Sequence, residues 1–167
     1  EETVSSTADG AVSVFAIDVD GDGDTDILSA SQYDDTIAWH ENDGNQVFTE
    51  RVITSDANMA NSVYAVDVDG DNDIDVLSAS DTDNTIAWYE NNGSQVFTEH
   101  VISSTANRAR EVFATDVDGD GDVDVLSASM NDDKIAWYEN NGSENFVERV
   151  ISTDADGAQD VYAADVD

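Results

Sequence analysis

Nine residues rich in aspartate recur at a fixed spacing along the chain. The stretch 18–26 reads Asp-Val-Asp-Gly-Asp-Gly-Asp-Thr-Asp, and copies with one or two changes occupy 67–75 and 116–124. Successive copies begin 49 residues apart, and a further copy begins at Asp165. Five carboxylates in nine residues repel one another in a compact state unless a cation lies among them. Calcium takes six to eight oxygen ligands at about 2.3–2.6 Å, so each complete stretch predicts a calcium loop.

The prediction is about one calcium ion per complete repeat, three in this chain, bound by the aspartates at positions 1, 3, 5, 7 and 9 of each stretch. These residues are Asp18, Asp20, Asp22, Asp24, Asp26, Asp67, Asp69, Asp71, Asp73, Asp75, Asp116, Asp118, Asp120, Asp122 and Asp124.

Two other kinds of calcium loop fit the pattern less well. An EF-hand needs a bidentate glutamate at position 12 and flanking helices, whereas position 12 is serine in all three copies, as at Ser29. Calcium-binding β-helices repeat every nine residues rather than every 49. A set of solvated acidic turns with no metal would leave the regular spacing unexplained.

Short β-branched and aromatic segments separated by Gly, Asn and Asp predict strands. In the first repeat these segments are 14–17, 26–31, 36–40 and 46–53, and no segment has the pattern of a helix. Four strands per repeat at a period of 40–50 residues are typical of a propeller blade. The expected fold is therefore all-β, a β-propeller segment of four-stranded blades.

The spacing divides residues 1–167 into one partial propeller domain of about 3.4 blades. The expected repeats are 12–60, 61–109 and 110–158, followed by a partial repeat at 159–167, with 1–11 as the tail of a preceding blade. An open arc leaves unpaired sheet faces and edges. We therefore expect either a longer propeller or self-association that closes a ring of about seven blades.

The segment 14–31, Val-Phe-Ala-Ile-Asp-Val-Asp-Gly-Asp-Gly-Asp-Thr-Asp-Ile-Leu-Ser-Ala-Ser, resembles the FG-GAP/VCBS class of β-propeller repeats, and so do its copies 49 and 98 residues later. The resemblance covers essentially the whole chain and implies calcium in the loop between the first and second strands. That class includes the integrin α-subunit propeller. The Phe-Gly and Gly-Ala-Pro motifs are missing here, with Ser29-Ala-Ser31 at the second position, so the resemblance does not by itself imply integrin-type ligand binding.

Charge restricts the partners of the chain. The net charge is −34, from 39 acidic residues against five Lys and Arg. Three calcium ions would leave it strongly negative, which excludes nucleic acid and anionic membranes as partners. No apolar run approaches the roughly 18 residues of a membrane span, so we expect no membrane insertion. Because millimolar calcium is mainly extracellular, a secreted or cell-surface location is expected.

Loops at the two ends of the blades differ in how much they vary. The calcium loops are nearly identical between repeats, whereas the second-to-third-strand loops and the blade-to-blade connections change. Loops on a rigid scaffold usually carry recognition. Tyr33, Arg108, Arg110 and Lys134 fall in these variable loops and are candidate ligand-binding residues, with the cations suited to a uronate or sulfate group. The alternative is that the cations only relieve local repulsion or pair with Glu111 and Asp132.

We expect no enzyme, because the sequence has no nucleophile motif or phosphate loop, and His40 and His100 occupy non-equivalent positions. Trp39, Trp88 and Trp137 are expected to pack between sheets rather than to stack on sugars. The function expected first is a calcium-dependent carbohydrate-binding, lectin-like extracellular module. The alternatives are a cell-surface adhesion or protein-interaction propeller and a non-catalytic accessory domain of a secreted polysaccharide-degrading enzyme.

Overall fold

A computed structural model describes residues 3–166 of the chain and contains three four-stranded antiparallel sheets and, within those residues, no helix. Each sheet is a simple meander in which neighbouring strands are consecutive in the chain, with strand orders β1-β2-β3-β4, β5-β6-β7-β8 and β9-β10-β11-β12. The strands are β1 (Ala11–Ile17), β2 (Asp26–Ser31), β3 (Thr36–Asn42), β4 (Phe48–Thr54), β5 (Ala60–Val66), β6 (Asp75–Ser80), β7 (Thr85–Asn91), β8 (Phe97–Ser103), β9 (Ala109–Thr115), β10 (Asp124–Ser129), β11 (Lys134–Asn140) and β12 (Phe146–Ser152).

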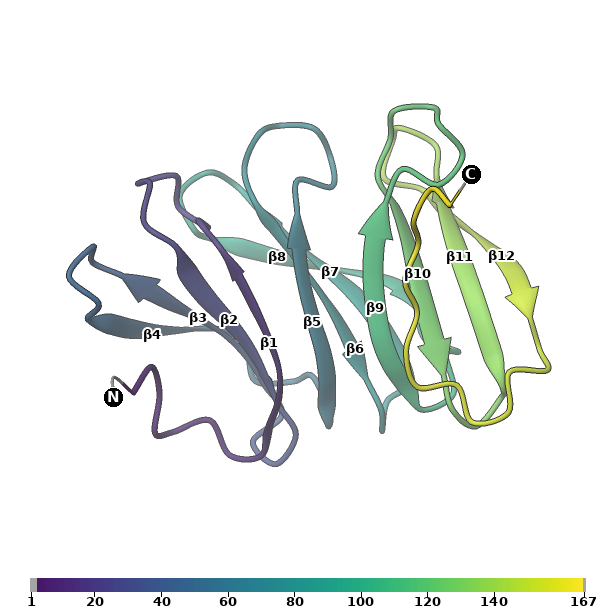
Figure 1. Cartoon of the computed structure of the whole chain (residues 1–167), viewed down its shortest axis with the longest axis horizontal. Coiled ribbons are helices and arrows are strands. Elements are labelled where there is room, and N and C mark those ends of the chain that lie inside the picture. Colours follow the sequence, from purple (N-terminus) through teal and green to yellow (C-terminus); the bar gives the residue numbers. More distant parts are fainter. Residues whose placement is uncertain (1–2, 167) are drawn as a thin grey trace.

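These sheets confirm the predicted all-β class and the four strands per repeat. We call the sheets blades 1, 2 and 3 in chain order. They stand side by side in an arc with β1, β5 and β9 as adjacent inner strands (Figure 1). The four predicted strands of the first repeat all form, and differ from β1 to β4 by at most three residues at an end. Asp167 of the predicted fourth stretch and residues 1–2 of the predicted tail lie outside the described residues.

The hydrophobic core lies between blades rather than inside one. In the first cluster, Leu28 and Trp39 of blade 1 pack against Val76 and Tyr89 of blade 2. Leu77 and Trp88, on the opposite face of blade 2, belong to a second cluster shared with blade 3. Successive side chains of a strand point to opposite faces of its sheet, so every central blade contributes to two cores. The prediction that tryptophans pack between sheets is confirmed at Trp39 and Trp88, which are 2% and 1% exposed.

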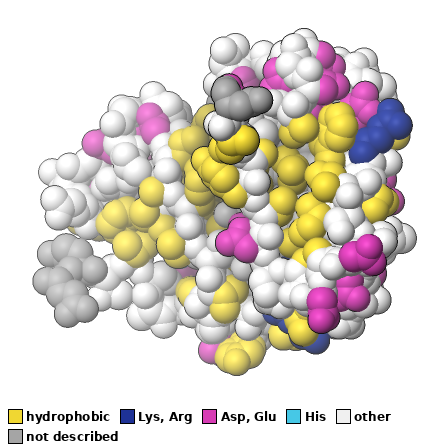
Figure 2. All heavy atoms as spheres, turned by 45° about the vertical axis from the view of Figure 1, so that its right-hand side comes forward, with side chains coloured by type: hydrophobic (Ala, Val, Ile, Leu, Met, Phe, Trp, Pro, Cys, Tyr) yellow, Lys and Arg dark blue, Asp and Glu magenta, His cyan; other side chains and the backbone are white. Residues whose placement is uncertain are grey.

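An aromatic side chain at the middle of each inner strand contacts the next one. Ring centroids are 4.7 Å apart for Phe15 and Tyr64, 5.0 Å for Tyr64 and Phe113, and 4.7 Å for Phe113 and Tyr162. The ring planes are tilted by 51–54°, a geometry that aromatic pairs favour over a face-to-face sandwich. This row continues past blade 3 onto the C-terminal segment, where Tyr162 is exposed. Figure 2 shows hydrophobic side chains on this side of the molecule.

Loops sort onto two ends of the blades because neighbouring strands are antiparallel. At one end the aspartate loops lie beside the turns between third and fourth strands, since the Asp73 carboxylate touches Gly93. At the other end the second-to-third-strand loop of blade 1 bonds to the connections before and after it, for example through Gln32 N–H to the Gly10 carbonyl (3.1 Å) and Ala57 N–H to the Asp35 carbonyl (3.0 Å). Over residues 3–166, no helix is long and apolar enough to cross a membrane.

Candidate metal centre

Carboxylates converge in all three aspartate loops, each of which joins the first and second strand of a blade. In the blade 2 loop, one oxygen from each of Asp67, Asp69 and Asp71 lies within 4.8 Å of the others. These are positions 1, 3 and 5 of the nine-residue stretch. The corresponding groups are Asp18, Asp20 and Asp22 in blade 1 and Asp116, Asp118 and Asp124 in blade 3.

Backbone amides of the loop hold the first carboxylate in place. Asp67 Oδ1 accepts a hydrogen bond from Gly70 N–H (2.8 Å), and its Oδ2 accepts one from Asn72 N–H (3.0 Å). Asn72 has φ of +76°, and its counterparts Gly23 and Gly121 have φ of +95° and +99°. The sixth residue of the stretch therefore has a left-handed backbone in all three loops. This conformation favours glycine and tolerates asparagine.

The ninth aspartate is buried at the base of each loop. Asp75 is fully buried, and its two oxygens accept hydrogen bonds from Val68 N–H (3.0 Å) and Asn91 N–H (2.8 Å). It thereby joins the start of the loop to the end of β7. Asp26 and Asp124 are bonded in the same way. In blade 3 the ninth aspartate also belongs to the converging group.

The seventh aspartate is directed away from the converging groups. The carboxylate of Asp73 lies against Gly93, in the turn between β7 and β8, so closely that a Cβ on this glycine would overlap it. Asp24 and Asp122 contact Gly44 and Gly142 in the same manner. The structure thus brings together three of the five predicted aspartates of each loop. The assignment of all fifteen as calcium ligands stays a prediction.

Sequence reasoning did not identify the asparagine at the end of each third strand as part of this centre. The side chain of Asn91 is 1% exposed; its Nδ2 donates to the Ile74 carbonyl (3.1 Å) and its Oδ1 accepts from Gly93 N–H (3.2 Å). One side chain therefore bridges the aspartate loop and the neighbouring turn. Its recurrence at Asn42 and Asn140 was the signal available in the sequence.

The aspartate loops form no ion pairs with the basic side chains of the described residues. None of the seven ion pairs found among residues 3–166 includes an aspartate of the three complete loops. Burial, opposed by a hydrogen bond from the backbone of Asp71 and reinforced by the charge of Asp71, raises the pKa of Asp69. Burial raises the pKa of Asp75 to about 6 despite the hydrogen bonds that it accepts. Raised carboxyl pKa values mean that the folded loop resists a full negative charge.

These loops fit a hard divalent cation. The donor set consists of oxygen, the convergent carboxylates carry uncompensated charge, and the backbone fixes their directions, which together suit calcium. Three such groups, one per blade, are consistent with one calcium ion per repeat. A bound cation would supply charge neutralisation and would cross-link the positions that converge.

At the opposite end of the blades, the two predicted ligand-binding arginines already have a carboxylate partner. Arg108 Nε donates to both oxygens of Asp81 (3.1 Å each), and Arg110 lies 2.8 Å from the same carboxylate. The Asp81 side chain is 6% exposed. Arg110 also donates to Asn61 Oδ1 (3.3 Å) and to the Met130 sulfur (3.3 Å), so it connects blades 2 and 3.

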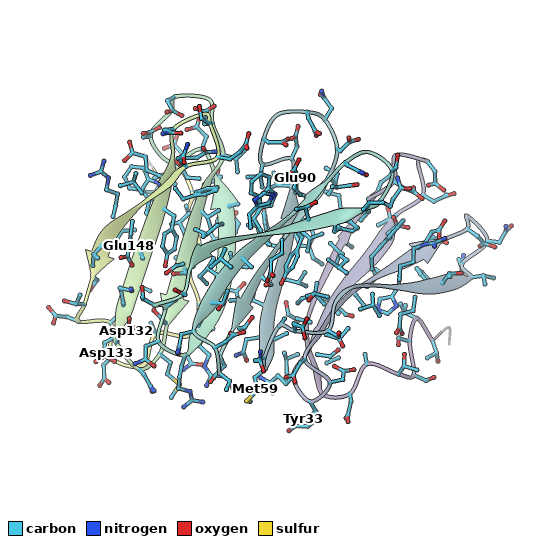
Figure 3. All side chains as sticks on the ribbon, turned by 180° about the vertical axis from the view of Figure 1, so that it is seen from behind. Tyr33, Met59, Glu90, Asp132, Asp133 and Glu148 are labelled. Carbon is cyan, nitrogen blue, oxygen red and sulfur yellow. The ribbon has the colours of Figure 1, made fainter. Side chains whose placement is uncertain are left out.

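Lys134 forms ion pairs with two other acids, whereas Tyr33 is an exposed side chain. Lys134 Nζ lies 2.7 Å from Glu148 and 3.5 Å from Asp132. Tyr33 is 72% exposed, and its ring lies over Gly10. Tyr33 and Asp132 lie at the same end of the blades, which is opposite to the aspartate loops (Figure 3). The structure therefore pairs Arg108 with Arg110 but places neither Lys134 nor Tyr33 in contact with them.

The two histidines differ in burial, since His40 is buried and His100 is half-exposed. His40 is 1% exposed, with Nε2 2.9 Å from Ser29 Oγ, and burial lowers its pKa. His100 stacks on Trp88 at 4.7 Å and lies 2.8 Å from Glu90. Neither belongs to a group of potential metal ligands among the described residues.

Comparison with known families gives one match that covers most of the chain. The family described as FG-GAP-like repeat matches three overlapping segments, residues 18–78, 67–127 and 116–167. Each match begins at the first aspartate of a nine-residue stretch, so the aspartate loops are part of what is recognised. No curated protein matches the chain.

Proposed function

Because the chain belongs to the FG-GAP-like repeat family, we propose that it is an extracellular calcium-binding propeller module that recognises carbohydrate. Repeats of this family are usually found in extracellular or cell-surface proteins and are typically non-catalytic. The observation that carries the calcium part is the triad of convergent carboxylates in each blade, none of which forms an ion pair within residues 3–166. In this proposal calcium stabilises the scaffold, and the opposite end of the blades binds the ligand.

The carbohydrate part rests on the junction of blades 2 and 3. Arg108, Arg110 and Asn61 converge there, and the Arg108 side chain is 37% exposed. Asp81 holds both arginines in position before a ligand arrives. Planar guanidinium groups suit uronate and sulfate groups, which they bind through paired hydrogen bonds. An incoming acidic sugar would share these donors with Asp81.

A glycan array in millimolar calcium, repeated in chelator, tests the proposal. The array includes neutral, uronate-containing and sulfated polysaccharides. We expect binding to one acidic glycan class that requires calcium and is lost in Arg108→Ala. The matched control is Arg51→Ala. Arg51 is an exposed arginine on the outer strand β4 that pairs with Glu41, and its removal should leave binding unchanged.

A blank array from protein that is shown to be folded would contradict the carbohydrate proposal. The second candidate, recognition of a protein partner, would then be favoured by the exposed valines of the outer strands, such as Val52, Val101 and Val150. A finding that the folded chain does not bind calcium would contradict the proposal as a whole.

A further inference from the structure

The turns between third and fourth strands differ in one chemically important residue. Blade 2 has Asn92-Gly93 and blade 3 has Asn141-Gly142, whereas blade 1 has Asp43-Gly44. An asparagine followed by glycine is open to attack on its side-chain amide by the next backbone nitrogen, because glycine has no Cβ to obstruct the approach. Both asparagines and both glycines are exposed.

Hydrogen bonds already polarise the side-chain amide of Asn92. Its Oδ1 accepts from Ser94 N–H (3.0 Å) and from Val96 N–H (3.3 Å). Donors on this oxygen withdraw electron density from Cγ and stabilise negative charge on the oxygen during attack. In blade 3, Asn141 Oδ1 accepts from Ser143 N–H (3.1 Å).

Blade 1 shows that the same turn accommodates a carboxylate. Asp43 Oδ1 accepts from Asn45 N–H (2.9 Å) and Val47 N–H (3.1 Å), the counterparts of the two donors to Asn92. These two backbone hydrogen bonds lower the pKa of Asp43. A charged acceptor makes stronger hydrogen bonds than a neutral amide oxygen, so aspartate suits this position at least as well as asparagine.

We propose that Asn92 and Asn141 are sites of spontaneous deamidation, and that the folded turn accepts the aspartate product. The backbone nitrogen of Gly93 loses its proton and forms a bond to Cγ of Asn92, and the side-chain nitrogen leaves as ammonia. Water then opens the resulting five-membered succinimide. The net change is asparagine plus water to aspartate plus ammonia, and no oxidant or cofactor is needed. The same steps apply to Asn141 and Gly142.

The two products of ring opening have different consequences for the calcium end of the blade. Ordinary aspartate reproduces the blade 1 turn. Isoaspartate, from opening at the other carbonyl, adds a backbone carbon next to Gly93, which contacts Asp73 of the aspartate loop. The second product therefore disturbs the contact between loop and turn, whereas the first preserves it.

Peptide mapping by mass spectrometry tests the proposal after the folded chain is held in warm alkaline buffer with calcium. We expect the peptides with Asn92 and Asn141 to gain the mass of amide-to-acid conversion, with isoaspartate detected in part of the product. Asn91 and Asn140 are internal controls, because they are the last residues of β7 and β11, next to these turns, but are buried and precede asparagine rather than glycine; they should remain amides. Asn92→Asp should abolish the mass gain at that peptide.

A synthetic peptide spanning residues 88–98 gives the reference rate for the unstructured sequence. Retention of both amides in the folded chain under conditions that convert this peptide would overturn the proposal, because the turn would then protect asparagine. A second readout is the melting temperature of Asn92→Asp in calcium. A melting temperature equal to that of the parent chain supports acceptance of the product, and a marked decrease contradicts it.

Discussion

The carboxylate of Asp73 rests on Gly93, so the aspartate loop of blade 2 is in direct contact with the turn between β7 and β8. Gly93 has φ of +73°, and a side chain at this position would meet both the left-handed backbone and the carboxylate. The same contact recurs in the other two blades. The turn and the loop therefore form one structural unit.

Replacement of Gly93 by alanine should weaken both stability and calcium binding. The left-handed backbone alone costs about 1–2 kcal/mol for a residue with a Cβ, and the displaced Asp73 carboxylate should disturb its loop. The control is Gly157→Ala, since Gly157 has φ of +66° but open space around its Cβ position. Isothermal titration with calcium should show weakened binding only for Gly93→Ala; equal binding in both variants would contradict the coupling.

Removal of calcium should lower the melting temperature substantially. Each occupied loop adds about 2.7 kcal/mol to the free energy of unfolding when free calcium is one hundred times its Kd, and the loops are separate. Thermal unfolding followed by circular dichroism in calcium, magnesium and chelator measures the effect. Magnesium should protect less, because it requires smaller octahedral geometry and retains water. Identical melting in calcium and chelator would refute the assignment of the loops.

Lowering the pH should increase the contribution of Asp75 to the stability of the metal-free chain and should decrease the stabilisation that calcium provides. Burial raises the pKa of Asp75 to about 6 from 3.8, so the folded state binds this proton more tightly than the unfolded state. In chelator, the contribution of this group to stability is therefore lowest above pH 6 and increases by about 3 kcal/mol as pH falls toward 4. In calcium, protons compete with the metal, and the calcium-dependent stabilisation should decrease below pH 6.

The variant Asp75→Asn distinguishes the titration of Asp75 from the general decrease in repulsion between carboxylates at low pH. Urea unfolding at several pH values, with and without chelator, gives the free energy of unfolding of both proteins. We expect the difference between parent and variant to depend on pH between about 4 and 6. A difference that is constant over this range would rule out the raised pKa.

Replacing a tryptophan that packs between blades should strongly reduce the free energy of unfolding. Trp88 is 1% exposed in the cluster shared by blades 2 and 3, and replacing a buried tryptophan by alanine typically costs about 3–5 kcal/mol. Val101→Ala, on the outer strand where the side chain is 58% exposed, should change the free energy of unfolding by much less. Urea unfolding of both variants in calcium measures the difference, and comparable losses would argue against a core located between blades.

Much of the fold was predictable because the same strand and loop pattern occurs in three copies of the repeat. The strand that follows each aspartate stretch was predicted at 26–31 and is observed as Asp26–Ser31, since loop and strand patterns are distinct there. The ends of the outer strand were less well predicted: 46–53 was expected and Phe48–Thr54 is observed. Gln46 lies in the turn with φ of +66°, a conformation that local composition does not reveal.

The types of residue in the site were predictable from the sequence, but the directions of their side chains were not. Spacing alone made Asp73 equivalent to Asp67, although the first contacts a turn and the second joins the converging carboxylates. The bridging role of Asn91 depends on the end of β7 approaching the loop, which is a tertiary contact. Likewise, the pairing of Arg108 and Arg110 with Asp81 depends on the packing of neighbouring blades.

The placement of the core between blades determines how the chain should come apart. A central blade loses two apolar contacts when it unfolds, whereas a terminal blade loses one, so the free energy of opening depends on position in the array. Amide hydrogen exchange should consequently be slowest in β5 and β6 of blade 2 and faster in blades 1 and 3. Each additional blade would add one more shared core, so resistance to unfolding grows with the number of junctions rather than with the quality of any single sheet.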